Sequence, residues 1–357
     1  MILENINMIK KLIDLFKKYS RFFSSLGLVS GLIITPFTLT RIDELSNNLW
    51  IIIQIIIAVL SIVVLNYLEN KIKVGKISQK YSGSINFWFA LIIQFAFGNL
   101  FSTYITFYFR SSTIFLSWPF ILIIFALLIS NEIWVRHYSR LTLQLTTLFL
   151  SIYMFLIFFL PVLFNRIGND VFLYSGISSL FFIFVLVLIL FSFSREKFIK
   201  SKKGLIFSIL GTYIIVNGMY FLNIIPPLPL SVKEAGVYYD ISKVNGEYVF
   251  DGLTKTWKDY FSIYETFYKK EKKPVYVFTS IFSPTKFNQK IIHEWQYYDV
   301  FYREWVTSSL VSLDTFGGRD DGYRTYSMKE NIYNGKWRVN VLASNKRVIG
   351  RVNFEVR

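Results

Sequence analysis

The strongest constraint on this chain is an apolar run that ends at a cluster of prolines. Residues 205–225 are apolar and about long enough to cross a bilayer as an α-helix. Pro226, Pro227 and Pro229 follow the run, and proline cannot continue a helix because it lacks the amide donor. The pattern predicts a membrane helix that stops here, a proline-rich junction over 226–230, and a different kind of domain beyond it.

Composition and further apolar runs indicate several membrane spans. The chain has 357 residues, of which 53% are hydrophobic and 19% aromatic, as is typical of a protein with many spans. We predict an all-α bundle of seven transmembrane helices over residues 22–225. The first run lacks a clear cleavage site, so we expect an uncleaved anchor. The predicted spans are 22–40, 49–68, 85–109, 113–134, 141–164, 172–193 and 205–225.

Residues 1–21 form a basic segment with helical spacing of its apolar side chains. Ile2, Ile6, Ile9 and Ile13 recur at this spacing, and lysines are available for the polar side. Two interpretations remain open, an interfacial helix on an anionic leaflet or the cationic flank of the first span.

The basic residues of the predicted loops are distributed very unevenly between the two sides of the membrane. One side carries 16 of them and the opposite short loops carry Arg41, Arg110 and Arg166. Positive charge is retained on the cytoplasmic side, so we expect a cytoplasmic N-terminus and a periplasmic or extracellular C-terminal domain. The 16 are Lys10, Lys11, Lys17, Lys18, Arg21, Lys71, Lys73, Lys76, Lys80, Arg136, Arg140, Arg195, Lys197, Lys200, Lys202 and Lys203.

The same distribution argues against nucleic acid as a partner, although the net charge is +16. Residues 230–357 carry 20 Lys/Arg and 15 Asp/Glu, so this domain is only mildly basic. The excess lies in short loops between apolar runs. We therefore predict the lipid bilayer as a partner and no nucleic acid.

Several kinds of chemistry are absent from the sequence. There is no cysteine, which excludes disulfides, thiolate catalysis and cysteine-ligated metals. The two histidines, His137 and His293, are far apart in sequence, so no histidine-rich metal site forms within one chain. Ionisable residues are nearly absent from the predicted spans, and no acidic relay is visible. We predict no cofactor, no metal and no catalytic residues.

From residue 231 the apolar pattern changes to period two, which is typical of half-buried strands. Turn residues such as Asn245-Gly246 and Asn334-Gly335 separate the strands. We predict an extracytoplasmic all-β sandwich over 231–357, with an immunoglobulin-like fold as one option. The stretch at 251–273 is less regular, and 260–268 is compatible with a short helix. The predicted strands are 236–241, 246–250, 274–282, 289–297, 300–313, 323–328, 336–342 and 347–356.

Several motifs in this domain have a fixed order. They are PVYVF (274–278), HEW (293–295), GGRDDGYRTYSMKENIYNGKWRVNV (317–341) and VIGRVNFEV (348–356). In these residues the chain resembles the family called domain of unknown function 2914, over roughly 274–357. The resemblance implies a bacterial inner-membrane protein with a periplasmic β-domain, and it brings no established activity or catalytic residue. Tyr326 stands where many relatives are expected to have tryptophan, so an aromatic residue is kept.

Aromatic and charged residues of this domain are candidates for a ligand-binding patch, because aromatic platforms beside guanidinium groups suit sugars, carboxylates and phosphates. Structural roles are the alternative: a hydrogen-bonded core histidine, a core tryptophan at Trp337, and ion pairs that brace a turn. The candidates are His293, Trp295, Arg319, Asp321, Arg324, Tyr326 and Arg338.

Three functional hypotheses follow from this architecture. The first is a non-enzymatic membrane protein whose β-domain binds an envelope component, a glycan or a partner protein. The second is a transporter or lipid-handling protein with an accessory outer domain. The third is a sensor that relays to a separate cytoplasmic partner.

Overall fold

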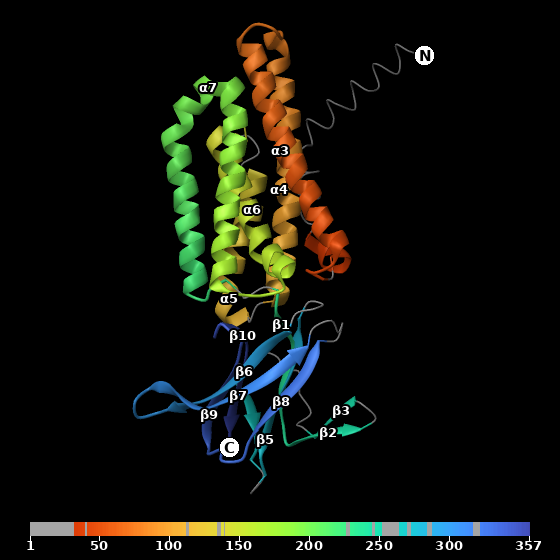
Figure 1. The fold of residues 1–357 in the computed structure, drawn as a ribbon, viewed down its shortest axis with the longest axis vertical. Coiled ribbons are helices and arrows are strands. Elements are labelled where there is room, and N and C mark those ends of the chain that lie inside the picture. The colour runs from red at the N-terminus through yellow and green to blue at the C-terminus, as the bar shows by residue number, and fades with distance from the viewer. Residues whose placement is uncertain are drawn as a thin grey trace. The chain divides into compact units, whose positions relative to one another are not determined.

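The computed structural model of the chain divides into two compact units (Figure 1). The helical unit comprises Met1–Phe107, Ile121–Leu156 and Gly176–Val216, and the C-terminal unit comprises Tyr108–Phe120, Ile157–Ser175 and Asn217–Arg357. The C-terminal unit therefore contains helix ends as well as strands. The structure describes residues 32–39, 41–111, 114–133, 137–138, 140–225, 229–244, 247–251, 264–269, 273–283, 288–316 and 322–357.

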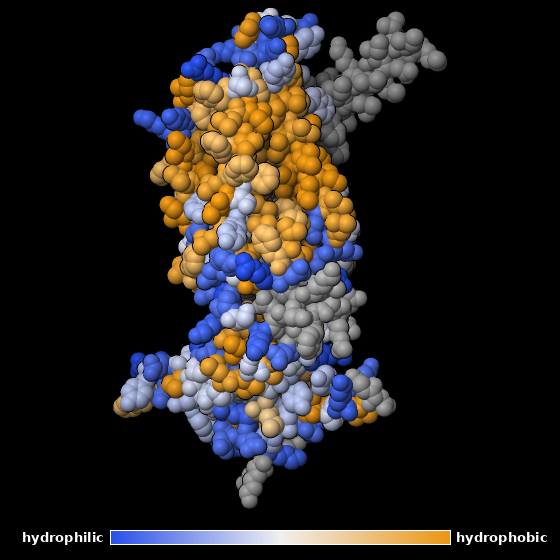
Figure 2. Space-filling view, in the orientation of Figure 1, coloured by the Kyte–Doolittle hydropathy of each residue, from blue (hydrophilic) through white to orange (hydrophobic). Residues whose placement is uncertain are grey.

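Long apolar helices make up the described part of the N-terminal region. Four are long and apolar enough to cross a membrane, and the fifth, α5, has a shorter apolar segment at Ser117–Ile133. Figure 2 shows hydrophobic side chains covering much of their surface. The helices are α3 (Leu45–Lys73), α4 (Ser82–Ser111, preceded by the 3-10 turn η1, Gln79–Tyr81), α5 (Ile114–Ile133), α6 (Leu141–Phe164) and α7 (Asn169–Phe221), with a further helical segment at 32–38.

The prediction of seven separate spans differs from this arrangement. The two spans expected at 172–193 and 205–225 are arms of one 53-residue helix, α7, which bends at Ser194 (φ −121°, ψ 35°). The segment 194–204 between them contains no proline and several good helix formers, so the backbone stays helical on both sides of the bend. The first predicted span and the basic segment 1–21 lie largely outside the described residues.

The two arms of α7 run antiparallel, side by side (Figure 1). A Cβ atom at Gly176 would lie 2.8 Å from the ring of Tyr213 and 2.9 Å from the hydroxyl of Tyr153. The absence of a side chain at this position lets the aromatic rings approach the backbone of the first arm. The rings of Tyr153 and Tyr213 stack with centroids 5.9 Å apart. A small residue thus permits close helix packing.

The C-terminal region is built from strands in two main sheets and a small hairpin. A three-stranded sheet has the order β1-β5-β8, a five-stranded sheet has the order β4-β10-β9-β6-β7, and β2 pairs with β3. All pairs are antiparallel except β4 with β10. The strands are β1 (Ser231–Tyr238), β2 (Asp240–Val244), β3 (Glu247–Asp251), β4 (Glu265–Phe267), β5 (Val275–Phe282), β6 (Asn288–Asp299), β7 (Glu304–Phe316), β8 (Tyr323–Lys329), β9 (Gly335–Leu342) and β10 (Val348–Val356).

The strand predictions hold in outline and fail at three places. The strand expected at 236–241 is divided between β1 and β2, which belong to different sheets. Residues 265–267 form β4 instead of part of a short helix, because they pair in parallel with β10. The strand expected from residue 300 begins only at Glu304, because Asp299 turns the chain. Its carboxylate accepts hydrogen bonds from the amides of Phe301 (2.8 Å) and Tyr302 (3.0 Å). Among the described residues, the three-plus-five arrangement also differs from the four-plus-three sheets of an immunoglobulin constant domain.

The two main sheets enclose two apolar clusters, and the larger one contains both buried tryptophans. Trp295, Trp337 and Phe354 from the five-stranded sheet are fully buried against valines of the three-stranded sheet, including Val277. The prediction that Trp337 belongs to the core is confirmed, and its indole N–H donates to the carbonyl of Tyr333 at 2.9 Å. Burial of two tryptophans with their polar atoms paired stabilises this arrangement.

Within the C-terminal unit, Arg347 links the strands to the end of α7. Arg347 follows the β9–β10 turn and is only 6% exposed. Its guanidinium donates to the carbonyl of Ile225 and, at 3.3 Å, to the side chain of Asn223, and it lies 3.7 Å from the ring centre of Tyr220. Tyr220 in turn stacks on Phe172, with centroids 3.5 Å apart. A cation at a helix C-terminus is favourable because the last carbonyls carry partial negative charge.

We predict that Arg347→Ala destabilises the protein by about 3 kcal/mol, since it leaves a buried carbonyl unpaired and removes the cation–π contact. The thermal unfolding midpoint of the full chain in detergent measures this loss. Arg357→Ala removes a more exposed arginine of the same domain and should change stability by less than about 0.5 kcal/mol. Equal effects of both variants would contradict a special role for Arg347.

Candidate functional site

The structure does not gather the predicted ligand-binding residues into one patch. Arg319 and Asp321 lie outside the described residues. The other five fall in three places. These are the core between the main sheets (His293, Trp295), the outer face of the three-stranded sheet (Arg324, Tyr326) and the outer face of the five-stranded sheet (Arg338).

His293 and Trp295 take part in a polar network inside the core. Both are 0% exposed. The two imidazole nitrogens of His293 lie 2.9 Å from the hydroxyl of Ser327 and 3.0 Å from that of Thr279. The indole of Trp295 donates to the same Ser327 oxygen at 3.0 Å. Side chains of β6 therefore bind β5 and β8 across the interior.

This network stabilises the core and offers no reactive group to a ligand. A serine next to a histidine is the arrangement of an activated nucleophile, but catalysis also needs access for a substrate. Ser327 is 4% exposed and His293 is fully buried. Burial also lowers the pKa of His293 to about 4, because the charged imidazolium is poorly solvated there.

Arg324 and Tyr326 lie on β8, facing away from this core. Tyr326 is 38% exposed and sits beside aromatic side chains of the β2–β3 hairpin. Its ring is 6.2 Å from that of Tyr248, whose hydroxyl donates to the carbonyl of Arg324 at 3.4 Å. Phe250 of the hairpin packs on Phe278 of β5 at 4.7 Å. The hairpin is thus held on this face by aromatic contacts.

Arg338 belongs to a hydrogen-bonded layer on the outer side of the five-stranded sheet. We call this layer the polar face. Asn340 is its centre, donating to Glu294 at 2.8 Å and accepting from Arg351 at 2.6 Å. Gln296 accepts from Arg338 at 2.6 Å. The members of the polar face are Glu294, Gln296, Thr307, Arg338, Asn340 and Arg351.

An aromatic side chain supports the polar face at one edge. The guanidinium of Arg338 lies 4.2 Å from the ring centre of Trp305, and Trp305 contacts Tyr298 edge to face at 5.3 Å. Stacking and the bond to Gln296 hold the guanidinium in one orientation. No described residue accepts a hydrogen bond from the terminal nitrogens of Arg338 or Arg351.

The polar face carries two cations and one carboxylate. Burial and the neighbouring Arg351 lower the pKa of Arg338 to about 10, and the Glu294 carboxylate acts in the opposite direction. Burial likewise lowers the pKa of Arg351, with Glu294 again opposing it. Both guanidinium groups therefore lie where additional negative charge would be favourable.

Sequence reasoning missed Trp305, Arg351 and the side-chain amides of Gln296 and Asn340 that connect Arg351 with Arg338. Strand alternation predicts that Arg338 and Asn340 face away from Trp337. It does not predict that β6, β9 and β10 are neighbours. The pairing of Gln296 with Arg338 comes from the register between β6 and β9, which are distant in sequence, and that of Asn340 with Arg351 comes from the register of the β9–β10 hairpin.

The β6–β7 hairpin extends beyond the rest of the sheet, as Figure 1 shows. Its tip exposes Val300 (80%), Phe301 (85%) and Tyr302 (70%). Tyr298 and Trp305, which pair at the base of the tip, connect these apolar side chains to the polar face. Exposed apolar residues that adjoin a polar surface are typical of interaction sites.

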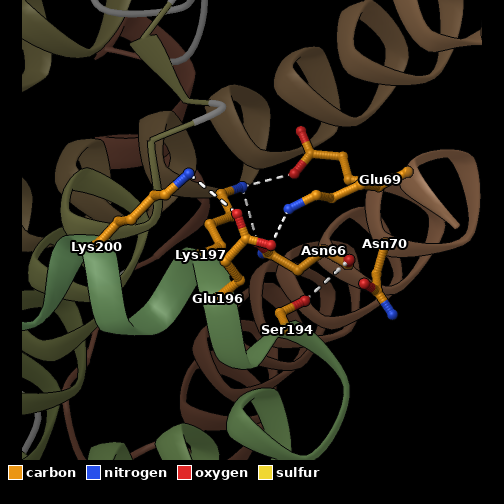
Figure 3. Close-up of a pocket in the computed structure, with 8 residues that line it drawn as sticks. Asn66, Glu69, Asn70, Ser194, Glu196, Lys197 and Lys200 are labelled. Carbon is orange, nitrogen blue, oxygen red and sulfur yellow. Dashed lines mark hydrogen bonds and ion pairs between the residues drawn. The ribbon is translucent and has the colours of Figure 1, made fainter.

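A separate polar pocket of about 260 Å³ lies in the helical unit, between α3 and the bend of α7 (Figure 3). Asn66, fully buried at its base, donates to Gln144 at 2.9 Å and accepts from Lys197 at 2.9 Å. Lys197 also pairs with Glu69 at 2.6 Å. The lining residues are Asn66, Glu69, Asn70, Lys73, Ser194, Glu196, Lys197 and Lys200.

The pocket is more polar than a helix–helix contact requires. The Ser194 hydroxyl at the bend donates to the carbonyl of Asn66 at 3.1 Å, which ties the two helices together. At the mouth, Glu196 pairs with both Lys73 and Lys200. Within the described ranges, no group of three or more His, Asp or Glu side chains is placed to hold a metal ion.

Residues 288–356 match the family described as protein of unknown function (DUF2914). The resemblance predicted from the sequence is confirmed for this region. The DUF2914 segment begins at β6 and runs through β10, so it contains the whole polar face and the exposed hairpin tip. The family name supplies no activity.

The other comparisons add no functional information. No curated protein matches the chain. Among solved structures, Pseudomonas fluorescens alkylpurine DNA glycosylase AlkC bound to DNA containing an abasic site analog aligns with 89% of this chain and 99% of its own. The two are 9% identical with a TM-score of 0.23, and a similarity this low does not indicate a common fold.

We predict that His293 makes stability depend on pH. Its pKa is about 4 in the folded protein and near 6.5 when unfolded, so the unfolded state binds more protons between these values. The free energy of unfolding is therefore higher above pH 6.5 than at pH 4, by about 3 kcal/mol from this group alone. The difference develops as the pH falls from 6.5 to 4.

Unfolding midpoints of the full chain between pH 7 and pH 4 test this prediction. His293→Gln should flatten the dependence, whereas His137→Gln, at an exposed position, should leave it unchanged. A wild-type slope identical to that of His293→Gln would contradict the prediction.

Proposed function

We propose that this chain is an integral protein of a bacterial inner membrane that presents an extracytoplasmic β-sandwich to bind an envelope component, without catalysing a reaction. Four long apolar helices support membrane insertion. The ratio of 16 basic loop residues to three supports the orientation. The polar face of the DUF2914 segment is the binding surface in this proposal, with an anionic glycan or an acidic partner protein as its ligand.

The proposed function rests on the imbalance of charge on the polar face. Arg338 and Arg351 share the surface with one carboxylate, Glu294, and their terminal nitrogens have no described acceptor. A carboxylate or phosphate would restore the balance and could accept two parallel hydrogen bonds from a guanidinium.

Two features of the polar face reduce the cost of binding. Hydrogen bonds from the guanidinium groups to Gln296 and Asn340 orient them before a ligand arrives. Trp305 adds an aromatic plane beside them, and aromatic planes stack on the apolar faces of sugar rings. The exposed tip at 300–302 extends the same surface and would contact a larger partner.

We predict that Arg338→Gln and Trp305→Ala each weaken ligand binding by about tenfold or more, because each removes one anchor of the surface. Full-length protein in detergent is sedimented with insoluble cell-wall sacculi, and the bound fraction is measured. Lys233→Gln makes the same change of charge on the three-stranded sheet and should bind as wild type does. Unchanged binding by both site variants would disprove the polar face as the binding surface.

The predicted orientation can be tested separately because the chain has no cysteine. Val300→Cys places a thiol at the exposed hairpin tip, and Lys202→Cys places one near the bend of α7. In intact spheroplasts a membrane-impermeant maleimide should label the first and not the second. After permeabilisation it should label both. The reverse pattern would place the β-domain in the cytoplasm.

Arg347 favours a sensor as the second candidate function. It joins the β9–β10 turn to the end of α7 through Ile225, Asn223 and Tyr220. A displacement of β9 or β10 on ligand binding would therefore reach the helix directly. In this candidate a ligand contact at the polar face shifts α7, and Arg347→Ala abolishes the response while binding remains.

A further inference from the structure

The polar pocket of the helical unit lies outside the proposed ligand surface and has a different chemistry. Its lining contains three lysines and two glutamates. The segments 66–80 and 194–204, which surround it, together carry nine basic and two acidic residues. Both acidic residues, Glu69 and Glu196, are already paired with lysines of the pocket. The pocket therefore has an excess of positive charge.

We propose that this pocket binds the phosphate headgroup of an anionic phospholipid. Glu196 forms ion pairs with the ammonium groups of both Lys73 and Lys200. These three side chains are 57%, 58% and 75% exposed, respectively, and exposed ion pairs contribute little to stability. A headgroup phosphate can therefore replace the Glu196 carboxylate between the two lysines.

Lys197 supplies a fixed charge deeper in the pocket. Its ammonium group is held by the side-chain oxygen of Asn66 at 2.9 Å and by Glu69 at 2.6 Å. Asn66 is itself fixed by Gln144 of α6. The site thus combines an ordered base with two exposed lysines at the entrance.

The helices that carry the pocket also expose apolar side chains, which favours a lipid over free phosphate. On α3, Leu60 (57% exposed) and Val64 (38%) are four residues apart, on one side of the helix. On α7, Leu188 (54%) and Phe191 (37%) are three residues apart. Figure 2 shows an apolar surface over the helices that gives way to hydrophilic side chains at one end. Acyl chains can lie along such a surface while the headgroup reaches the lysines, and basic pockets between membrane helices bind anionic headgroups.

Tail-matched phosphatidylglycerol and phosphatidylcholine, added to the delipidated full chain in detergent, test this proposal. Native mass spectrometry counts bound lipids, and the unfolding midpoint reports stabilisation. We expect phosphatidylglycerol to bind more tightly. The double variant Lys73→Gln/Lys200→Gln should weaken its binding by about tenfold.

Two further variants keep the test decisive. Lys202→Gln/Lys203→Gln also removes two positive charges, both from the arm of α7 that carries Lys200, but neither residue lines the pocket, so this variant should bind lipid as wild type does. Glu196→Gln removes the carboxylate that competes with phosphate, so it should bind phosphatidylglycerol more tightly. This gain is measurable even if the double lysine variant fails to fold.

Three results would overturn the proposal. Equal binding of the two lipids would show that the headgroup is not recognised. Equal losses in the two lysine double variants would show that general positive charge, and not the pocket, attracts the lipid. Stabilisation by inorganic phosphate as great as that by phosphatidylglycerol at equal concentration would assign the pocket to a free anion.

Discussion

The C-terminal domain depends on the burial of Trp295 and Trp337 between its two main sheets. Both side chains are fully enclosed and their indole nitrogens are hydrogen-bonded, so the inner faces of β6 and β9 have only one acceptable orientation. Strand side chains alternate between faces, and this orientation therefore turns Gln296, Arg338 and Asn340 outward. The polar face is a consequence of the core on its other side.

The same core explains why His293 is an unsuitable ligand-binding residue while Arg338 is suitable. The two lie on neighbouring strands of one sheet, but they face opposite sides of it. His293 is neutral and enclosed, with hydroxyl groups at both nitrogens. Arg338 lies against Trp305 with its terminal nitrogens directed toward no described acceptor. Burial decides which polar group stabilises the fold and which can interact with a partner.

Two polar regions of the chain thus have separate proposed roles. The polar face recognises an anionic envelope component through guanidinium groups, and the pocket at the bend of α7 holds a lipid headgroup through ammonium groups. Arginine suits the first because its planar fork is held in place by Gln296 and Trp305. Lysine suits the second because Lys73 and Lys200 can reorient around a mobile headgroup.

Local patterns in the sequence determined much of this protein. Apolar runs and prolines marked a helical region followed by strands, alternation placed Trp337 in the core, and ordered motifs identified the DUF2914 segment. Only the tertiary structure decided the rest. Two expected spans are arms of one helix that bends at Ser194, because the segment between them is built of helix formers and the packing around it sets the bend. The register between β6 and β9 assembled the polar face, because these strands are distant in sequence and meet only through pairing.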